Sequence, residues 1–198
     1  MRERRLGYAA MWLLVLGAWF SLVFYGADWI TAHRPRHVVP YFAWELQLPF
    51  IPSLAVVYLT MNLLIAIALV ALGTRRELRA LALALCADIL IAGVGFILYP
   101  AQLAFPEPLG TGTWAMFFHF ADRLNGDYNL VPSLHVALAV TCVSAYATRA
   151  KPLWWLWATA IAASTLLTHQ HHVIDVVTGW LLGIAGGRLY RGMNQSQL

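Results

Sequence analysis

The sequence predicts an all-α polytopic membrane protein with six transmembrane helices. Hydrophobic residues make up 61% of the 198-residue chain and charged residues only 11%, whereas soluble domains carry about 25% charged residues. The mean hydropathy is +0.66. The apolar residues form continuous runs, unlike the alternating pattern of a transmembrane β-barrel strand. Nine tryptophans, eight tyrosines and nine phenylalanines suit side chains at the lipid–water boundary.

Six apolar segments approach the roughly 20 residues that a helix needs to cross a bilayer. They cover residues 8–29, 51–72, 78–98, 131–148, 153–168 and 172–189. The first is longer than the apolar core of a cleaved signal peptide, so we expect it to remain as a membrane helix. Residues 1–198 then form a single membrane domain, with a short interfacial helix expected at 115–124.

The basic residues predict how this bundle is oriented. Three arginines, Arg34, Arg36 and Arg123, fall on one side of the six-helix topology. The other side carries Arg2, Arg4, Arg5, Arg75, Arg76, Arg79, Arg149, Lys151, Arg188 and Arg191. The positive-inside rule places the richer side, with both termini, in the cytoplasm. We expect a bacterial inner (plasma) membrane protein whose net charge of +4 reflects topology and not a nucleic-acid partner. The oligomeric state is left open.

The cysteines predict neither a disulfide framework nor a metal site. Cys86 and Cys142 fall inside apolar segments, where free cysteines behave as small core residues. No CxxC or HExxH spacing occurs, so no metal or other cofactor is expected.

His171 and Asp175 are spaced i, i+4 at the start of the last apolar segment. On a helix this spacing places both side chains on one face. The carboxylate can accept a proton from one ring nitrogen and leave the other nitrogen free to attack. His172 is an alternative, because i, i+3 also reaches Asp175. Equally, both histidines could be interfacial side chains beside an acid that the loop solvates.

Pro132-Ser133-Leu134-His135 opens the segment 131–148. Ser133 is a favourable N-cap residue. The first turn of a helix presents free N–H groups and the positive end of the helix dipole, which attract anions such as phosphate. His135, just inside this turn, could give a proton to a leaving oxygen. The alternative is a serine cap followed by a buried histidine that pairs with a carbonyl group.

The predicted topology brings these two clusters together. The segment 131–148 starts on the outer side, and the turn between 153–168 and 172–189 lies on that side too. His135 and His171 are therefore expected at the same membrane depth, where two imidazoles, a carboxylate and a helix N-terminus can converge on one anion.

Three other features are expected to be structural. Glu45 is interpreted as an exposed loop acid. Asp88, inside 78–98, is costly in a membrane and is expected to pair with another helix, with Asn62 as a candidate partner. The spacing of four glycines in the last segment favours close helix packing: Gly179, Gly183, Gly186 and Gly187.

These residues give the chain a resemblance to the type 2 phosphatidic acid phosphatase superfamily. This group of six-helix membrane phosphatases and phosphotransferases carries three motifs, KxxxxxxRP, PSGH and SRxxxxxHxxxD. The second motif is matched by Pro132, Ser133 and His135, with Leu134 in place of glycine. The first motif is not matched, because the loop after 78–98 reads Tyr-Pro-Ala-Gln at 99–102.

The third motif is matched by Ser164, His171 and Asp175 at the family spacing, with Thr165 where arginine is usual. The leucine in Pro-Ser-Leu-His and the Gln-His pair at 170–171 resemble the branch related to inositol phosphorylceramide synthases. That branch often carries a lysine before the Gln-His pair, where this chain has His169.

The resemblance implies a role for each matched residue. His171, oriented by Asp175, would attack the phosphorus of a lipid phosphate and form a phosphohistidine, while His135 protonates the leaving alcohol. The expected phosphate-binding residues are Ser133, Arg123, His169, Ser164 and Thr165. For each of these an ordinary structural role remains the alternative, such as a loop salt bridge for Arg123 or helix packing for Ser164.

The function expected from these residues is metal-independent hydrolysis of a lipid phosphate, such as a phosphatidate or a prenyl diphosphate, at the extracytoplasmic membrane surface. Two alternatives stay open. An alcohol in place of water would make the protein a lipid phosphotransferase, and the unmatched first motif could mark a non-catalytic carrier of lipid phosphates.

Overall fold

The protein is described by a computed structural model that covers residues 2–106, 112–146 and 150–195. These residues form seven α-helices and two short 3-10 helices. In chain order they are α1 (Arg2–Ala32), η1 (Ala43–Gln47), η2 (Pro52–Leu54), α2 (Ala55–Ala71), α3 (Arg75–Leu98), α4 (Ala115–Leu124), α5 (Leu134–Ala145), α6 (Lys151–Leu167) and α7 (Val173–Gln195).

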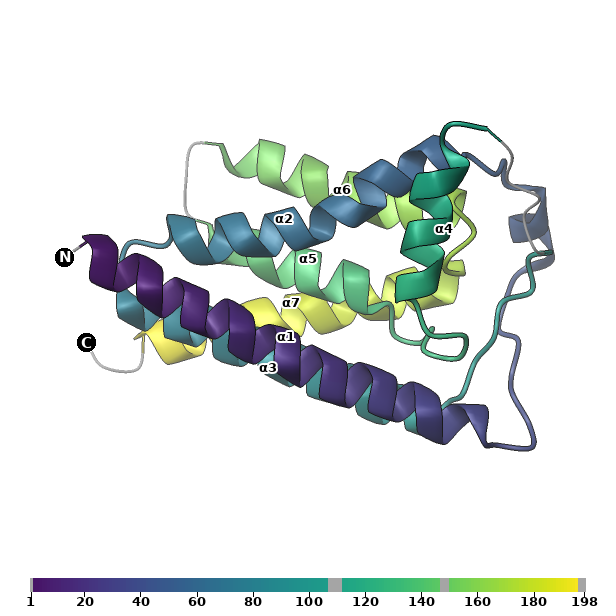
Figure 1. The fold of residues 1–198 in the computed structure, drawn as a ribbon, viewed down its shortest axis with the longest axis horizontal. Coiled ribbons are helices and arrows are strands. Elements are labelled where there is room, and N and C mark those ends of the chain that lie inside the picture. Colours follow the sequence, from purple (N-terminus) through teal and green to yellow (C-terminus); the bar gives the residue numbers. More distant parts are fainter. Residues whose placement is uncertain (1, 107–111, 147–149, 196–198) are drawn as a thin grey trace.

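The longer helices run side by side along the molecule, and α4 stands across one end of this bundle (Figure 1). The start of α1 and the end of α7 lie together at the opposite end. The long connections that contain η1, η2 and α4 therefore gather at a single end. The helix expected at 115–124 is confirmed by α4.

Within the described residues, four helical spans are long and apolar enough to cross a membrane: Leu6–Ala32, Pro52–Ala71, Arg75–Leu98 and Val173–Gln195. The expectation of six full spans is not confirmed. The predicted 131–148 corresponds to α5, which has only 12 residues, and 153–168 to α6, which has 17. Positions 147 and 148 of that prediction, and Arg149, lie outside the described residues.

The short α5 is the central helix of the bundle. Ten of its twelve residues are buried, and a helix that is apolar on all sides is one that other helices surround. Because α5 faces protein and not lipid, it has no need to match the thickness of the hydrocarbon layer. The sequence pattern alone does not distinguish such a core helix from a lipid-facing one.

The glycines of α7 allow α7 to pack closely against α5, as expected from their spacing. A Cβ atom built on Gly179 would overlap the carbonyl oxygen of Ser133, and one on Gly183 would lie 2.5 Å from that of Ala137. Cβ atoms on Gly186 and Gly187 would likewise meet side chains of α5. Backbone therefore packs on backbone along the α5–α7 interface.

Asp88 joins α3 to this interface. Its carboxylate accepts a hydrogen bond of 2.6 Å from the Thr141 hydroxyl of α5. The pairing of Asp88 with another helix is thus confirmed, but Asn62 is not its partner, since Asn62 lies on an exposed face of α2. A buried polar group in an apolar bundle needs such a bond to offset its lost hydration.

Gly183→Ala is expected to lower the free energy of unfolding by about 1–3 kcal/mol, since its methyl group would overpack the α5 interface. Gly192→Ala, in the same helix with nothing within 4 Å of its Cβ position, should gain up to about 1 kcal/mol from helix propensity. Thermal unfolding in detergent, followed by circular dichroism, measures both. Equal stability of the two variants would contradict the close α5–α7 contact.

Candidate functional site

The turn between α6 and α7 places the histidines of the third motif. The backbone carbonyl oxygen of Thr165 accepts hydrogen bonds from the N–H groups of Gln170 at 3.0 Å and His171 at 3.2 Å. His169 adopts a φ of +54°, in the left-handed region that non-glycine residues rarely visit. The chain can thereby reverse within the few residues between the two helices.

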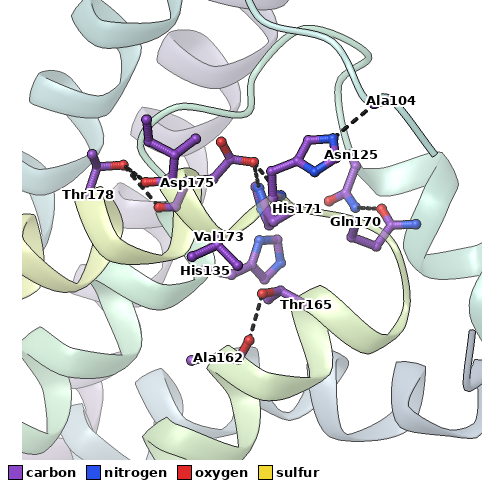
Figure 2. A network of polar contacts seen from close by, with 12 residues as sticks. Ala104, Asn125, His135, Ala162, Thr165, Gln170, His171, Val173, Asp175 and Thr178 are labelled. Atoms are coloured by element: carbon purple, nitrogen blue, oxygen red, sulfur yellow. Dashed lines mark hydrogen bonds and ion pairs between the residues drawn. The ribbon is translucent and has the colours of Figure 1, made fainter. Parts of the chain in front are cut away.

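His171 and Asp175 form the pair that their spacing predicts. The ring Nδ1 of His171 lies 3.3 Å from Oδ2 of Asp175 (Figure 2), and both side chains are buried. The same oxygen accepts the backbone N–H of His172 at 2.7 Å. Because the carboxylate holds the proton on Nδ1, the lone pair of His171 resides on Nε2.

His172 has both ring nitrogens occupied. Its Nδ1 lies 2.7 Å from Oε2 of Glu45, and its Nε2 accepts the backbone N–H of Ala104 at 3.0 Å. The Nε2 atom must therefore be unprotonated, and Nδ1 donates to the carboxylate. Of the two adjacent histidines, only His171 lines the cavity described below, so the geometry favours His171 over its rival as a nucleophile.

The expectation that Glu45 is exposed is wrong. The side chain is fully buried, and its two oxygens accept the backbone N–H groups of Phe42 and Val173 besides the His172 ring. This carboxylate ties the loop after α1 to the first turn of α7. Its partner His172 is 127 residues away in the sequence, and no local sequence pattern predicts a contact at that separation.

His135 meets His171 as the topology predicts. It is the second residue of α5, and its ring centroid lies 6.4 Å from that of His171. Figure 2 shows the His171 ring between the Asp175 carboxylate and the His135 ring. Since reacting atoms approach to about 3–3.5 Å before a bond forms, one phosphoryl group could contact both rings.

A chain of hydrogen bonds orients His135. The Tyr58 hydroxyl donates to Oδ1 of Asn125 at 2.6 Å and lies 3.0 Å from the His135 Nδ1, which must therefore donate to Tyr58. The Asn125 amide donates to Oε1 of Gln170 (Figure 2), and the Gln170 amide donates to Asp122 at 3.1 Å. Every donor points towards the Asp122 carboxylate, so this relay fixes a proton on Nδ1 of His135 and leaves the lone pair of its neutral ring on Nε2.

The rings of His135 and His171 open into a cavity of about 520 Å³ at the α4 end of the bundle. Its wall combines aromatic side chains with His119, Asp122 and Asp127. Among the described residues that line this cavity, none is a lysine or an arginine. These described lining residues therefore offer an anion the N–H groups at the start of α5 and the histidine rings.

The structure brings some of the expected phosphate-binding residues to the cavity and leaves others outside. Arg123 is exposed on α4 and does not line it. Ser133 precedes α5, but its side chain is fully buried and its hydroxyl bonds to no described side chain or backbone group. Its backbone N–H donates to the carbonyl oxygen of Asp175 at 2.9 Å, which fixes the start of α5 against α7.

The remaining three candidates have structural contacts. Ser164 and Thr165 donate their hydroxyls to carbonyl oxygens within α6 and do not line the cavity. His169 does line it, stacked on Phe105 at 4.0 Å with its Nε2 3.1 Å from the Leu48 carbonyl oxygen. Burial lowers the pKa of His169, against a smaller opposing effect of that carbonyl, so a protonated ring is disfavoured there.

The family model of the PAP2 superfamily matches residues 46–189. The chain belongs to the PAP2 superfamily. Its members are generally phosphatases or phosphotransferases, and the apolar spans above make this member a membrane protein. The match begins within η1 and ends within α7, so α1 lies outside it. Searches of curated proteins and of solved structures found no significant match.

Sequence reasoning missed five residues of this PAP2 site: Tyr58, Asn125, Asp122, Glu45 and the cavity-lining His119. Tyr58 is fully buried within the apolar α2. A phenol in such a helix usually finds a polar partner, and that was the available signal. The relay joins α2, the end of α4 and the α6–α7 turn, and it becomes visible only once the fold is known.

His172→Ala is expected to destabilise the fold by about 3–5 kcal/mol, because it leaves the buried Glu45 carboxylate without its ring partner. Thermal unfolding in detergent measures this loss. The control is His33→Ala, since His33 is exposed and its ring bonds only within α1; it should change stability by less than about 0.5 kcal/mol. If His172→Ala unfolds like the wild type, the pair is not structural.

Tyr58→Phe is expected to lower kcat about tenfold, a part of the roughly 10²–10⁴-fold that general acid–base catalysis contributes, and to move the pH–rate profile. The fold should be retained, because only a hydroxyl is lost. Tyr8→Phe at the far end of α1 should leave the profile unchanged. A Tyr58→Phe enzyme with the wild-type pH profile would show that the relay does not act on His135.

Proposed function

We propose that this PAP2 protein hydrolyses the phosphate ester of a membrane lipid through a phosphohistidine on His171. The observation that carries the proposal is the arrangement of three groups at one cavity wall. The Asp175 carboxylate holds Nδ1 of His171, which directs the lone pair of Nε2 away from the carboxylate, and the ring of His135 lies 6.4 Å away.

In the first step, Nε2 of His171 forms a bond to phosphorus while the bond from phosphorus to the lipid oxygen breaks. Protonated His135 gives its proton to that oxygen, and the lipid alcohol leaves. This step requires the protonated state of His135, and the relay that ends at Asp122 holds one of its two protons on Nδ1. The N–H groups at the start of α5, which Ser133 precedes, offset the charge on the phosphoryl oxygens.

In the second step, His135 takes a proton from water as the water oxygen attacks phosphorus. The bond between Nε2 and phosphorus breaks, and inorganic phosphate leaves. His135 is now protonated and ready for another cycle. The two steps use the His171–Asp175 pair, His135, the N–H groups at the start of α5, water and the substrate.

The arrangement favours an enzyme over a passive carrier. A carrier has to hold phosphate tightly, yet no lysine or arginine is found among the described residues that line the cavity. The ordered His171–Asp175 pair and the relay on His135 serve a chemical step and would add little to binding alone. An alcohol that enters in place of water would make the same site a phosphotransferase.

We also propose that the site faces the extracytoplasmic side of the plasma membrane. The start of α1, the α2–α3 connection and the end of α7 carry most of the basic residues and lie at the end opposite to α4 (Figure 1). By the positive-inside rule that end is cytoplasmic, which leaves the cavity on the outer surface.

Purified protein is expected to release phosphate from a panel of phosphatidate, prenyl diphosphate and alkyl phosphates, with a chelator present. His171→Ala should abolish turnover, because it removes the nucleophile, and should remain folded. Wild-type activity no higher than that of membranes without the protein would contradict the proposal. Transfer of phosphate to added inositol would instead identify a phosphotransferase.

A further inference from the structure

A second cavity of about 370 Å³ lies within the membrane part of the molecule, between α1, α2, α3 and α5. Its wall is mostly apolar and includes Leu13, Leu16, Phe20, Met61, Ile65 and Leu138. We refer to this cavity as the tail groove. Figure 1 shows α1 and α2 diverging towards the α4 end, with α5 between them.

The α1 side of the tail groove is a helical stripe. Leu13, Leu16, Gly17 and Phe20 recur at intervals of three and four residues, and Tyr25 lies further along the same wall. From Leu13 to Tyr25 the helix rises about 18 Å, more than half of the roughly 30 Å hydrocarbon thickness. The groove therefore runs along the membrane normal over a length comparable to that of a lipid chain.

The tail groove adjoins the catalytic cavity. Asn125 and His135 line both cavities, and Tyr58, which bonds to both residues, lines the groove. Three of the polar residues that line the groove, Tyr58, Asn125 and His135, gather at this junction. A long amphiphile with its phosphate between His135 and His171 would thus have an apolar channel leading away from its ester oxygen.

We propose that the tail groove binds the hydrocarbon chain of the lipid phosphate, so that the substrate chain lies inside the bundle and not in the surrounding bilayer. This inference rests on the proposed function of the catalytic cavity. Because the surrounding lipid is as apolar as the groove, the hydrophobic effect does not favour one over the other. The substrate chain is instead stabilised in the groove by van der Waals packing against fixed side chains. Since α1 lies outside the residues that the family model matches, the α1 wall of the groove is not part of the matched family region.

Gly17 provides a direct test. It lines the groove, and nothing lies within 4 Å of the position of its Cβ. Gly17→Leu should therefore fold and place a side chain where the substrate chain would lie. Gly26→Leu is the matched control, because its Cβ position is equally open and it belongs to the same helix but not to the groove.

The substrates for the test are hexadecyl phosphate in detergent micelles and p-nitrophenyl phosphate, which has no alkyl chain. Overpacking an occupied apolar site weakens binding by about tenfold or more. Gly17→Leu is accordingly expected to raise KM about tenfold for hexadecyl phosphate and to leave KM for p-nitrophenyl phosphate unchanged. Gly26→Leu should change neither value.

The possible outcomes separate this inference from the proposed function. If the wild type hydrolyses neither compound, the proposed function itself is overturned. An active Gly17→Leu variant with wild-type KM for hexadecyl phosphate, or with equal losses on both substrates, overturns the tail groove.

Should Gly17→Leu not fold, a smaller variant gives a second measurement. Gly17→Cys, in protein with alanine at positions 86 and 142, can be labelled with a maleimide. Hexadecylphosphonate should slow labelling at position 17 about tenfold and methylphosphonate should not, while Gly26→Cys is labelled at one rate throughout. Equal labelling of Gly17→Cys with and without the long phosphonate overturns the proposal.

Discussion

The contact between the start of α5 and the first turn of α7 determines the rest of the site. The backbone N–H of Ser133 donates to the carbonyl oxygen of Asp175 at 2.9 Å, and Gly179 leaves no room for a side chain between the two backbones. Two residues after Ser133 stands His135, and four residues before Asp175 stands His171. The separation of the rings thus follows from a backbone contact, and any residue larger than glycine at 179 would widen it.

The two adjacent histidines of this region have different roles. His172 faces the buried Glu45 and the N–H group of Ala104, so its ring is a structural link between distant loops. His171 has one nitrogen on Asp175 and the other available to a ligand. Neighbouring residues of the same type differ here because one points into packed protein and the other lines the cavity.

The electrostatics of the cavity are unusual for a site that would hold phosphate. Asp122 and Asp127 line its wall, and lysine and arginine do not occur among the described lining residues. On the proposed function, a phosphate would be bound by the N–H groups at the start of α5 and by the histidine rings of the cavity. The relay from His135 to Asp122 gives this carboxylate a structural role, since it terminates the hydrogen-bond chain that fixes the proton on Nδ1 of His135.

Much of this architecture could be predicted from the sequence, and the failures have a common cause. The length of the continuous apolar runs located the helices, and the i, i+4 spacing located the His171–Asp175 pair, because both depend on residues close in the chain. The burial of Glu45, the relay through Tyr58 and the enclosure of α5 depend on contacts between residues far apart. Arg123 was favoured because it is the basic residue nearest to the second motif, but α4 presents it away from the cavity.

Covalent trapping tests the central claim most directly. Protein mixed with excess lipid phosphate, quenched in alkali during turnover and digested, can be mapped by mass spectrometry. The account predicts a phosphoryl group on the imidazole of His171 and its absence from the Asp175→Asn protein. Turnover with phosphate on His172, or with no phosphohistidine at any time point, would contradict it.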